Sequence, residues 1–236
     1  MKRLATTIIG SIALVALAGS ASAALRSPQV TVNGGTLQGY LNGVGEAINV
    51  STDQQNIQRW LATVSNNSTF TIQVELTGNA ASNTYGIYDA ALAVPPLYQC
   101  FPGAATNGWF CVCAFRTAPT RVVVSLFDAS AAFLGSTTYL AGPPDRNDFA
   151  FYLQQPPGAG GQTLYQQDAR NAGSNPQMLV YAGTGINTGS WWLCMEDATA
   201  AQGADNDFDD AVLFLESLNP TPVHKATWGD LKARFK

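Results

Sequence analysis

The chain has 236 residues, of which only 12% are charged, and its 12 Lys and Arg residues against 16 Asp and Glu give a formal net charge of −4. An acidic balance without a basic groove argues against nucleic-acid binding. The single histidine, His224, lies close to the C-terminal end. The body of the chain therefore lacks the histidine that a Ser-His-Asp or Cys-His arrangement requires.

The first 23 residues have the features of a secretory signal peptide. Lys2 and Arg3 supply the positive start, residues 8–17 the apolar middle, and Ala21-Ser22-Ala23 a cleavage site of small residues. The apolar part is too short to span a bilayer comfortably, and no later segment is long and apolar enough to do so. We therefore expect cleavage after Ala23 and a mature protein without a transmembrane span that is secreted, periplasmic or on the cell surface.

Short strand-like segments follow along the chain, separated by Gly, Pro or Asn. Residues 70–76 are the clearest case, because apolar and polar residues alternate there with period two. The predicted strands are 70–76, 85–88, 109–115, 121–127, 133–140, 149–153, 163–166, 177–181, 191–195 and 208–215. Short strands at this spacing predict an all-β fold over residues 24–217, an antiparallel β-sandwich with a jelly-roll-like arrangement.

One segment departs from the strand pattern. Asp53 is placed to cap a short helix, and apolar residues follow it at helical spacing. These residues are Ile57, Trp60, Leu61 and Val64. We expect at most this one short helix in the domain, packed against the sandwich.

The C-terminal end has a different composition from the domain. Residues 218–222 contain two prolines, which stiffen the backbone and predict an extended linker. Residues 223–236 are basic, and Trp228, Leu231 and Phe235 fall on one face of a helix. This tail is expected to form a short amphipathic helix that docks on a membrane surface, on an export or sorting partner, or on its own acidic domain.

The chain contains four cysteines, Cys100, Cys111, Cys113 and Cys194. In an exported protein they suggest up to two disulfides, with three connectivities open. Cys111 and Cys113 point to the same face of one strand, which favours bonds from them to Cys100 and Cys194 over a bond between them. Zinc is not expected, because the C-x₂-C spacing and a nearby histidine are both missing. Buried free thiols are the alternative, because Cys111 and Cys113 lie in an apolar run.

The strongest site candidate is an acidic run near the C-terminal end. Five of the six residues from 205 to 210 offer side-chain oxygens, and four of them are aspartates. Carboxylates this close repel one another unless a cation neutralises them, and Ca²⁺ prefers such hard oxygen ligands. Glu196 and Asp197 end the strand at 191–195, so pairing of that strand with 208–215 would bring both acidic groups together, with residues 198–204 closing the site. The predicted Ca²⁺ ligands are Glu196, Asp197, Asp205, Asp207, Asp209 and Asp210.

The acidic run has other interpretations. An EF-hand is excluded, because Asp210 stands where the loop requires glycine. The acids can instead cap turns and backbone amides at the start of a strand. Glu196 and Asp209 are the pair to name for glycoside hydrolysis, but clustered acids resemble an ion site more than an acid and a base held apart, so we do not expect an enzyme. Trp191 and Trp192 are candidates for stacking on sugar rings.

Four segments occur in a characteristic order: Asp148–Leu153, Gln177–Tyr181, Trp192–Asp197 and Asp205–Asp210. With this order, residues 147–216 resemble the bacterial domain-of-unknown-function family 4114. The Glu-Asp pair followed by Asp-x-Asp-Phe-Asn/Asp-Asp is the specific part of the match. The resemblance implies an exported or surface-associated bacterial β domain, often found beside adhesion-like or anchoring modules, with no established activity.

These observations lead to one expectation about function. We expect a secreted, non-catalytic β-sandwich, stabilised by Ca²⁺, with a structural or adhesive role at the bacterial cell envelope or extracellular matrix. Its partner would be a cell-surface glycan or a matrix component. A carbohydrate-binding module is the alternative, and a glycoside-active enzyme the second alternative.

Overall fold

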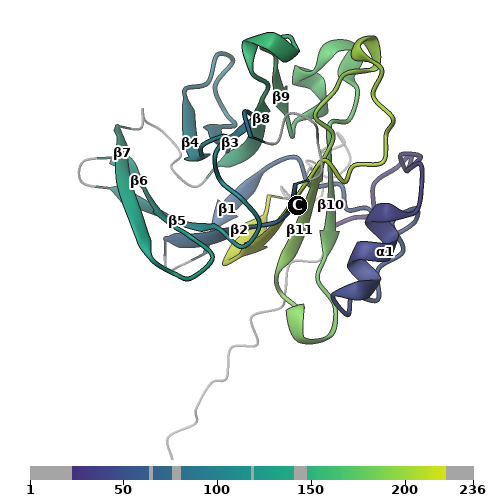
Figure 1. The fold of residues 1–236 in the computed structure, drawn as a ribbon, viewed down its shortest axis with the longest axis horizontal. Helices are drawn as coiled ribbons and strands as arrows, with labels where there is room; N and C mark the ends of the chain where they lie inside the picture. Colours follow the sequence, from purple (N-terminus) through teal and green to yellow (C-terminus); the bar gives the residue numbers. More distant parts are fainter. Residues whose placement is uncertain (1–22, 64–65, 76–80, 118–119, 141–147, 222–236) are drawn as a thin grey trace, which may run out of the picture.

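A computed structural model describes residues 23–63, 66–75, 81–117, 120–140 and 148–221. These residues form two antiparallel sheets, which confirms the all-β sandwich (Figure 1). The larger sheet has the order β10-β11-β12-β2-β5-β6-β7, and the smaller one the order β13-β1-β8-β3-β4 with β9 paired to β8. The elements are α1 (Thr36–Gly43), β1 (Trp60–Ala62), β2 (Asn67–Glu75), β3 (Thr84–Asp89), β4 (Leu97–Phe101), β5 (Phe110–Thr117), β6 (Thr120–Phe127), β7 (Phe133–Leu140), β8 (Phe149–Gln154), β9 (Thr163–Tyr165), β10 (Met178–Ala182), β11 (Trp191–Met195), β12 (Ala211–Glu216) and β13 (Leu218–Pro220), with 3₁₀ turns η1–η5 at Pro157–Ala159, Asp168–Arg170, Ala172–Ser174, Gly185–Asn187 and Ala200–Gln202.

Each of the ten predicted strands overlaps a strand of the structure, and three further strands were not predicted. One of these is β13, which pairs with β1 so that Trp60 lies opposite Pro220. Residues 218–220, assigned to the linker from the sequence, therefore belong to a sheet, and Leu218 is buried. The signal peptide up to Ser22 and the tail at 223–236 lie outside the described residues.

The predicted helix after Asp53 is wrong, and α1 lies elsewhere. The chain after Asp53 is extended: Gln55 bridges to Leu25 and Val180, and Trp60 begins β1. The apolar spacing there reflects separate contacts with the core. Asp53 does accept a backbone hydrogen bond, but from Asn49, at 2.8 Å between N and Oδ2.

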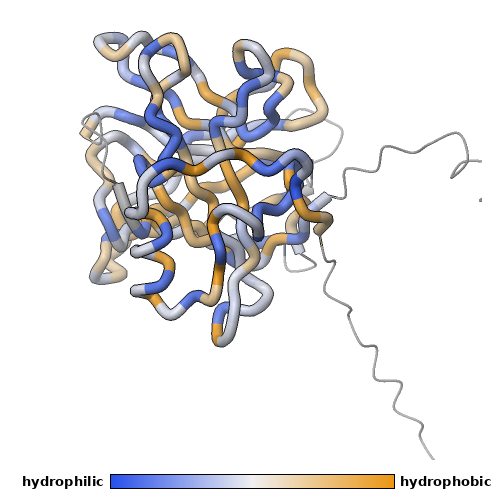
Figure 2. The backbone as a smooth tube through the Cα atoms, turned by 90° about the vertical axis from the view of Figure 1, so that its right-hand side faces the viewer, coloured by the Kyte–Doolittle hydropathy of each residue, from blue (hydrophilic) through white to orange (hydrophobic). Residues whose placement is uncertain are grey.

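Aromatic side chains join the two sheets. Trp60 of β1 packs against Trp191 of β11, with ring centroids 5.6 Å apart, and Phe70 of β2 packs against Phe151 of β8 at 4.8 Å. Trp60 also donates a hydrogen bond from Nε1 to Gln166 Oε1 at 2.9 Å, so its one polar group is satisfied in the core. Figure 2 shows hydrophobic residues concentrated in the segments that run through the middle of the molecule.

A second apolar layer covers the outer face of β10, β11 and β12. Helix α1 lies beside β10 and β11 (Figure 1), and its buried Leu37 and Leu41 belong to the same cluster as Trp192, Cys194 and other strand residues. The larger sheet is thus buried on both faces at this end. Phe208, from the acidic run, is completely buried in this layer.

Glu46 holds this layer to the loop after β10. It is 5% exposed and accepts hydrogen bonds from Trp192 Nε1 at 2.8 Å, Asn187 Nδ2 at 2.7 Å and Thr184 N at 2.6 Å. Burial raises the pKa of Glu46, but the hydrogen bonds from Thr184, Asn187 and Trp192 outweigh it, so the pKa is lower than that of an ordinary Glu. The ionised carboxylate is therefore part of the folded structure.

Glu46→Gln is expected to destabilise the domain by about 2 kcal/mol at pH 7, because the amide group of Gln places a donor against other donors. Because the folded pKa is lowered, the stability from Glu46 is present above the unfolded pKa near 4.5 and is lost as the pH falls. The difference between wild type and variant in urea unfolding should therefore shrink towards pH 4. A difference that stays constant with pH would contradict this role.

A candidate metal centre in the β11–β12 loop

The acidic residues lie at the two ends and in the middle of one hairpin loop. β11 and β12 pair antiparallel, with Met195 opposite Ala211, which confirms the hairpin on which the site prediction depends. Glu196 and Asp197 leave β11 as Asp209 and Asp210 enter β12. The loop between them includes η5 and is drawn in yellow-green in Figure 1.

The loop brings five of the six predicted ligands together in two overlapping groups. One group is Glu196, Asp197 and Asp210, and the other is Glu196, Asp205 and Asp207. In each group, one carboxylate oxygen per residue lies within 4.8 Å of the others. Two ligands bound to one Ca²⁺ at about 2.3–2.6 Å lie at most about 5 Å apart, so either group fits this ion. Glu196 belongs to both groups.

Asp209 is placed differently from the prediction and belongs to neither group. The prediction placed residues 208–215 in one strand and counted Asp209 among the ligands. In the structure β12 begins only at Ala211, and Asn206 and Phe208 adopt left-handed backbone with φ of 61° and 57°. Phe208 is buried under α1, and the neighbouring Asp209 is itself only 6% exposed, with Asp207 and Thr36 near its carboxylate but outside both groups of ligand oxygens.

Backbone and amide groups hold the carboxylates in place. The N–H of Asn206 donates to Glu196 Oε2 at 3.0 Å, and the N–H of Asp197 donates to Asp210 Oδ2 at 2.8 Å. These bonds match the turn-capping interpretation for two of the acids. They do not exclude an ion, because a carboxylate has two oxygens and about four lone-pair positions.

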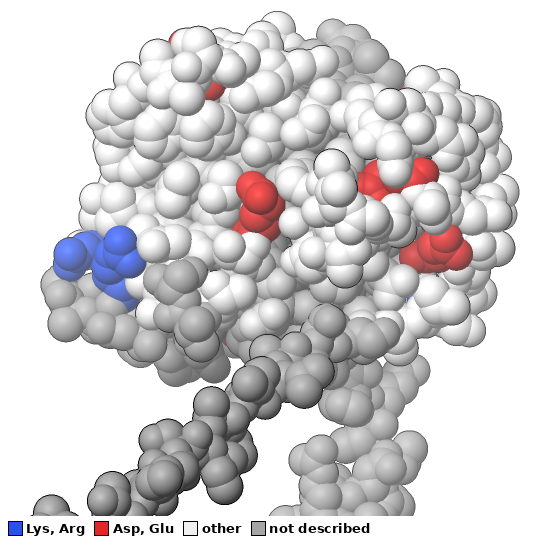
Figure 3. Space-filling view, turned by 90° about the horizontal axis from the view of Figure 1, so that it is seen from below, with Lys and Arg blue, Asp and Glu red and all other residues white. Residues whose placement is uncertain are grey.

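The electrostatics of the loop are those of unneutralised acids. Burial raises the pKa of Glu196 to about 8, and the carboxylates of Asp210, Asp205 and Asp207 add to the effect. Burial also raises the pKa of Asp210 to about 6, as it does for Asp209, where Asp207 contributes as well. In the part of the chain that the structure describes, the ion pairs join Arg26 to Asp168 and Arg59 to Asp148, away from this loop. Figure 3 likewise shows acidic groups separate from basic ones on the face it presents.

Sequence reasoning did not find two residues that support the site from the other sheet. Asn83, just before β3, donates from Nδ2 to Asp197 Oδ2 at 3.0 Å. Gln155, just after β8, donates from Nε2 to the backbone oxygen of Asp197. Both residues are buried, yet neither has a spacing or motif that links it to the acidic run. The contacts arise only when the two sheets pack.

The two tryptophans named for stacking on sugar rings are both buried. Trp191 is 7% exposed in the core between the sheets, and Trp192 is 3% exposed under α1. Neither ring face is open for stacking.

The cysteines also differ from the prediction. All four are buried and free, so the structure has the buried free thiols of the alternative interpretation and not the predicted disulfides. Cys194 lies in the layer under α1, whereas Cys111 and Cys113 lie in the core between the sheets. Bonds from Cys111 or Cys113 to Cys194 are therefore excluded, because the larger sheet separates the two clusters.

No protein-family model matches this chain, and a comparison with curated proteins found no match. The resemblance of residues 147–216 to the family of unknown function therefore rests on the quoted residues alone. Among the described residues, no helix is long and apolar enough to cross a membrane.

Proposed function

We propose that this protein is a secreted, non-catalytic β-sandwich that Ca²⁺ stabilises at the loop between β11 and β12. Its role would be structural or adhesive, at the bacterial cell envelope or in the extracellular matrix. The observation that carries the proposal is the convergence of two carboxylate groups on Glu196. The signal-peptide features and the family resemblance support the proposed location outside the cytoplasm.

The ion would bind at Glu196, Asp205 and Asp207. Asp205 is exposed and Asp207 half-buried, so water molecules can complete the six to eight oxygen ligands that Ca²⁺ takes. Asp197 and Asp210 are already tied at the stem of the hairpin through the hydrogen bond between them. Binding would connect the middle of the loop to the end of β11 and thereby fix a surface that can contact a partner.

A non-catalytic role is favoured by the crowding of the acids, because carboxylates clustered within 4.8 Å of one another resemble an ion site more than an acid and a base held apart. One cavity of about 400 Å³ is bordered by β4 and β7 and another lies near Arg26 and Asp168, and neither is lined by the six acids.

The adhesive role predicts Ca²⁺-dependent binding to the cell surface. Labelled mature protein should co-sediment with washed cell envelopes of the producing bacterium in millimolar Ca²⁺ and be released by EGTA. Glu196→Gln should reduce the bound fraction at least tenfold, whereas Glu216→Gln, the same change at the exposed end of β12, should not.

Three outcomes would contradict the proposal in different ways. Equal sedimentation with and without EGTA would remove the link between the ion and adhesion. Binding to a glycan array that survives chelation would favour the carbohydrate-binding module. Turnover of a glycoside that Glu196→Gln abolishes would favour the enzyme.

A further inference from the structure

Three of the four cysteines meet in the core between the sheets. Cys100 lies on β4 of the smaller sheet, and Cys111 and Cys113 lie on β5 of the larger one. Their sulfur atoms are all within 4.8 Å of one another, and Cys100 Sγ is 3.5 Å from Cys113 Sγ. Cys111 and Cys113 are two residues apart on one strand and therefore face the same side.

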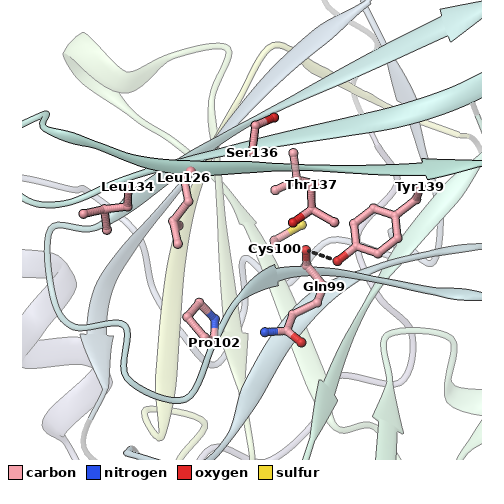
Figure 4. Close-up of a pocket in the computed structure, with 10 residues that line it drawn as sticks. Gln99, Cys100, Pro102, Leu126, Leu134, Ser136, Thr137 and Tyr139 are labelled. Atoms are coloured by element: carbon pink, nitrogen blue, oxygen red, sulfur yellow. Dashed lines mark hydrogen bonds between the residues drawn. The ribbon is translucent and has the colours of Figure 1, made fainter.

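A cavity connects this cluster with the outside. It has a volume of about 400 Å³ and is bordered by β4 on one side and β6 and β7 on the other. Figure 4 shows Cys100 and Gln99 of β4 and, across from them, Thr137 and Tyr139 of β7. The Tyr139 hydroxyl donates to the backbone oxygen of Gln99 at 3.1 Å and joins the two edges. Cys100 is the member of the cluster that lines the cavity.

We propose that Cys100, Cys111 and Cys113 bind one thiophilic d¹⁰ cation, Zn²⁺ in preference to Cu⁺, as three thiolates. Binding forms three metal–sulfur bonds and releases the three thiol protons to solvent. The fourth coordination position of Zn²⁺ would face the cavity and be filled by water, as in zinc sites with three protein ligands.

The distances suit this ion. A Zn–S bond of about 2.3 Å in a tetrahedral site places two sulfur atoms about 3.8 Å apart, close to the separation between Cys100 and Cys113. Three thiolates around Zn²⁺ leave one net negative charge, whereas around Cu⁺ they leave two. The smaller charge costs less to bury in the core. This difference favours the divalent ion.

Cys194 provides a comparison, because it is buried but is not part of the cluster of thiols. Burial raises the pKa of its thiol, with the charge of Asp209 adding to the effect. Burial acts on Cys100 too, but hydrogen bonds from Cys111, Cys113 and the backbone of Ile87 outweigh it and lower its pKa, while burial raises those of Cys111 and Cys113. The three thiols of the cluster thus interact with one another, as Cys194 does with no other thiol.

Zinc sites with ligands close in sequence contain C-x₂-C pairs or nearby histidines, and the absence of both is the reason that the sequence does not predict zinc. Here the ligands come from strands in different sheets, and β4 was not among the predicted strands. A metal at this position would tie the edge strand β4 to β5 across the core.

The test uses the reduced mature protein under nitrogen, saturated with Ca²⁺ to occupy the carboxylates, and titrated with Cd²⁺ as a spectroscopic probe for Zn²⁺. We expect a sulfur-to-cadmium charge-transfer band that saturates at one ion per chain and that added Zn²⁺ displaces. Cys113→Ser and Cys111→Ser should each weaken binding at least tenfold. Cys194→Ser should leave it unchanged, and the near-ultraviolet circular dichroism of each variant reports whether it is folded.

Carboxylates do not produce this band, so its appearance separates the thiol site from the acidic loop. The proposal is overturned if no band forms, or if Cys194→Ser removes as much binding as Cys113→Ser. It is also overturned if protein isolated from the culture medium has a Cys100–Cys113 or Cys100–Cys111 disulfide and contains no metal. Tighter binding of Cu⁺ than of Zn²⁺ in competition would overturn the stated preference for the divalent ion.

Discussion

Addition of Ca²⁺ to the chelator-treated protein is expected to raise its Tm by about 5–10 °C. An ion that binds only the native state at a hundred times its Kd adds about 2.7 kcal/mol, and a domain of this size gains roughly 2–4 °C per kcal/mol. Glu196→Gln should abolish this response, because Glu196 is the residue common to both carboxylate groups. Differential scanning calorimetry with EDTA and then with millimolar Ca²⁺ measures both effects.

Two further variants make this experiment specific. Glu216→Gln makes the same chemical change at the exposed end of β12 and should keep the full Ca²⁺ response. Asp209→Asn tests a point on which the prediction from the sequence and the structure differ. The sequence counts Asp209 as a ligand, whereas the structure leaves it outside both carboxylate groups, so we expect the variant to retain the response. An unchanged Tm of the wild type in millimolar Ca²⁺ would contradict the metal centre altogether.

Much of the fold could be predicted because the strands carry local signals. Alternation and β-branched or aromatic content located ten strands, including β7, whose limits 133–140 match the prediction. The strands that were missed are short or bordered by proline: β4 at 97–101 lies between Pro96 and Pro102, and β13 itself ends in Pro220. What makes them strands is a partner elsewhere in the chain, which local patterns do not contain.

The helix shows the same limit. Asp53 and the apolar residues after it have helical spacing, yet the segment is extended, because Gln55 pairs with Leu25 and Val180. In contrast, α1 contains Gly39 and Gly43, which disfavour helix, and only Leu37 and Leu41 mark its buried face. Packing on β10–β12 stabilises it against its weak propensity.

At the candidate site, the sequence predicted which acidic residues lie near one another, but not the directions in which their side chains point. The hairpin guarantees that residues 196–197 and 209–210 are close, because β11 and β12 pair directly. Which acids face one another depends on the left-handed residues Asn206 and Phe208. A Phe with a left-handed backbone conformation is uncommon. No local sequence pattern predicts this conformation for Phe208, whose ring is completely buried.

The stability of the Ca²⁺-free protein is expected to fall as the pH rises from 5 to 8. The folded pKa values of Glu196, about 8, and Asp210, about 6, are raised above those of the unfolded chain. The folded state therefore holds protons that the unfolded state has lost, and each deprotonation above the unfolded pKa costs stability. With screening by solvent at this loop, the loss amounts to about 2–3 kcal/mol in urea unfolding with EDTA.

Saturating Ca²⁺ should remove this loss, because the ion binds the deprotonated carboxylates and supplies the missing positive charge. The stabilisation by Ca²⁺ should accordingly be small at pH 5 and largest near pH 8, and Glu196→Gln should flatten the curve of the Ca²⁺-free protein. Glu46 does not interfere, since its lowered pKa acts below about pH 4.5. Parallel curves with and without Ca²⁺ would show that these carboxylates are not the ligands, even if the ion raises the Tm, because ligands with raised pKa values must link binding to proton release.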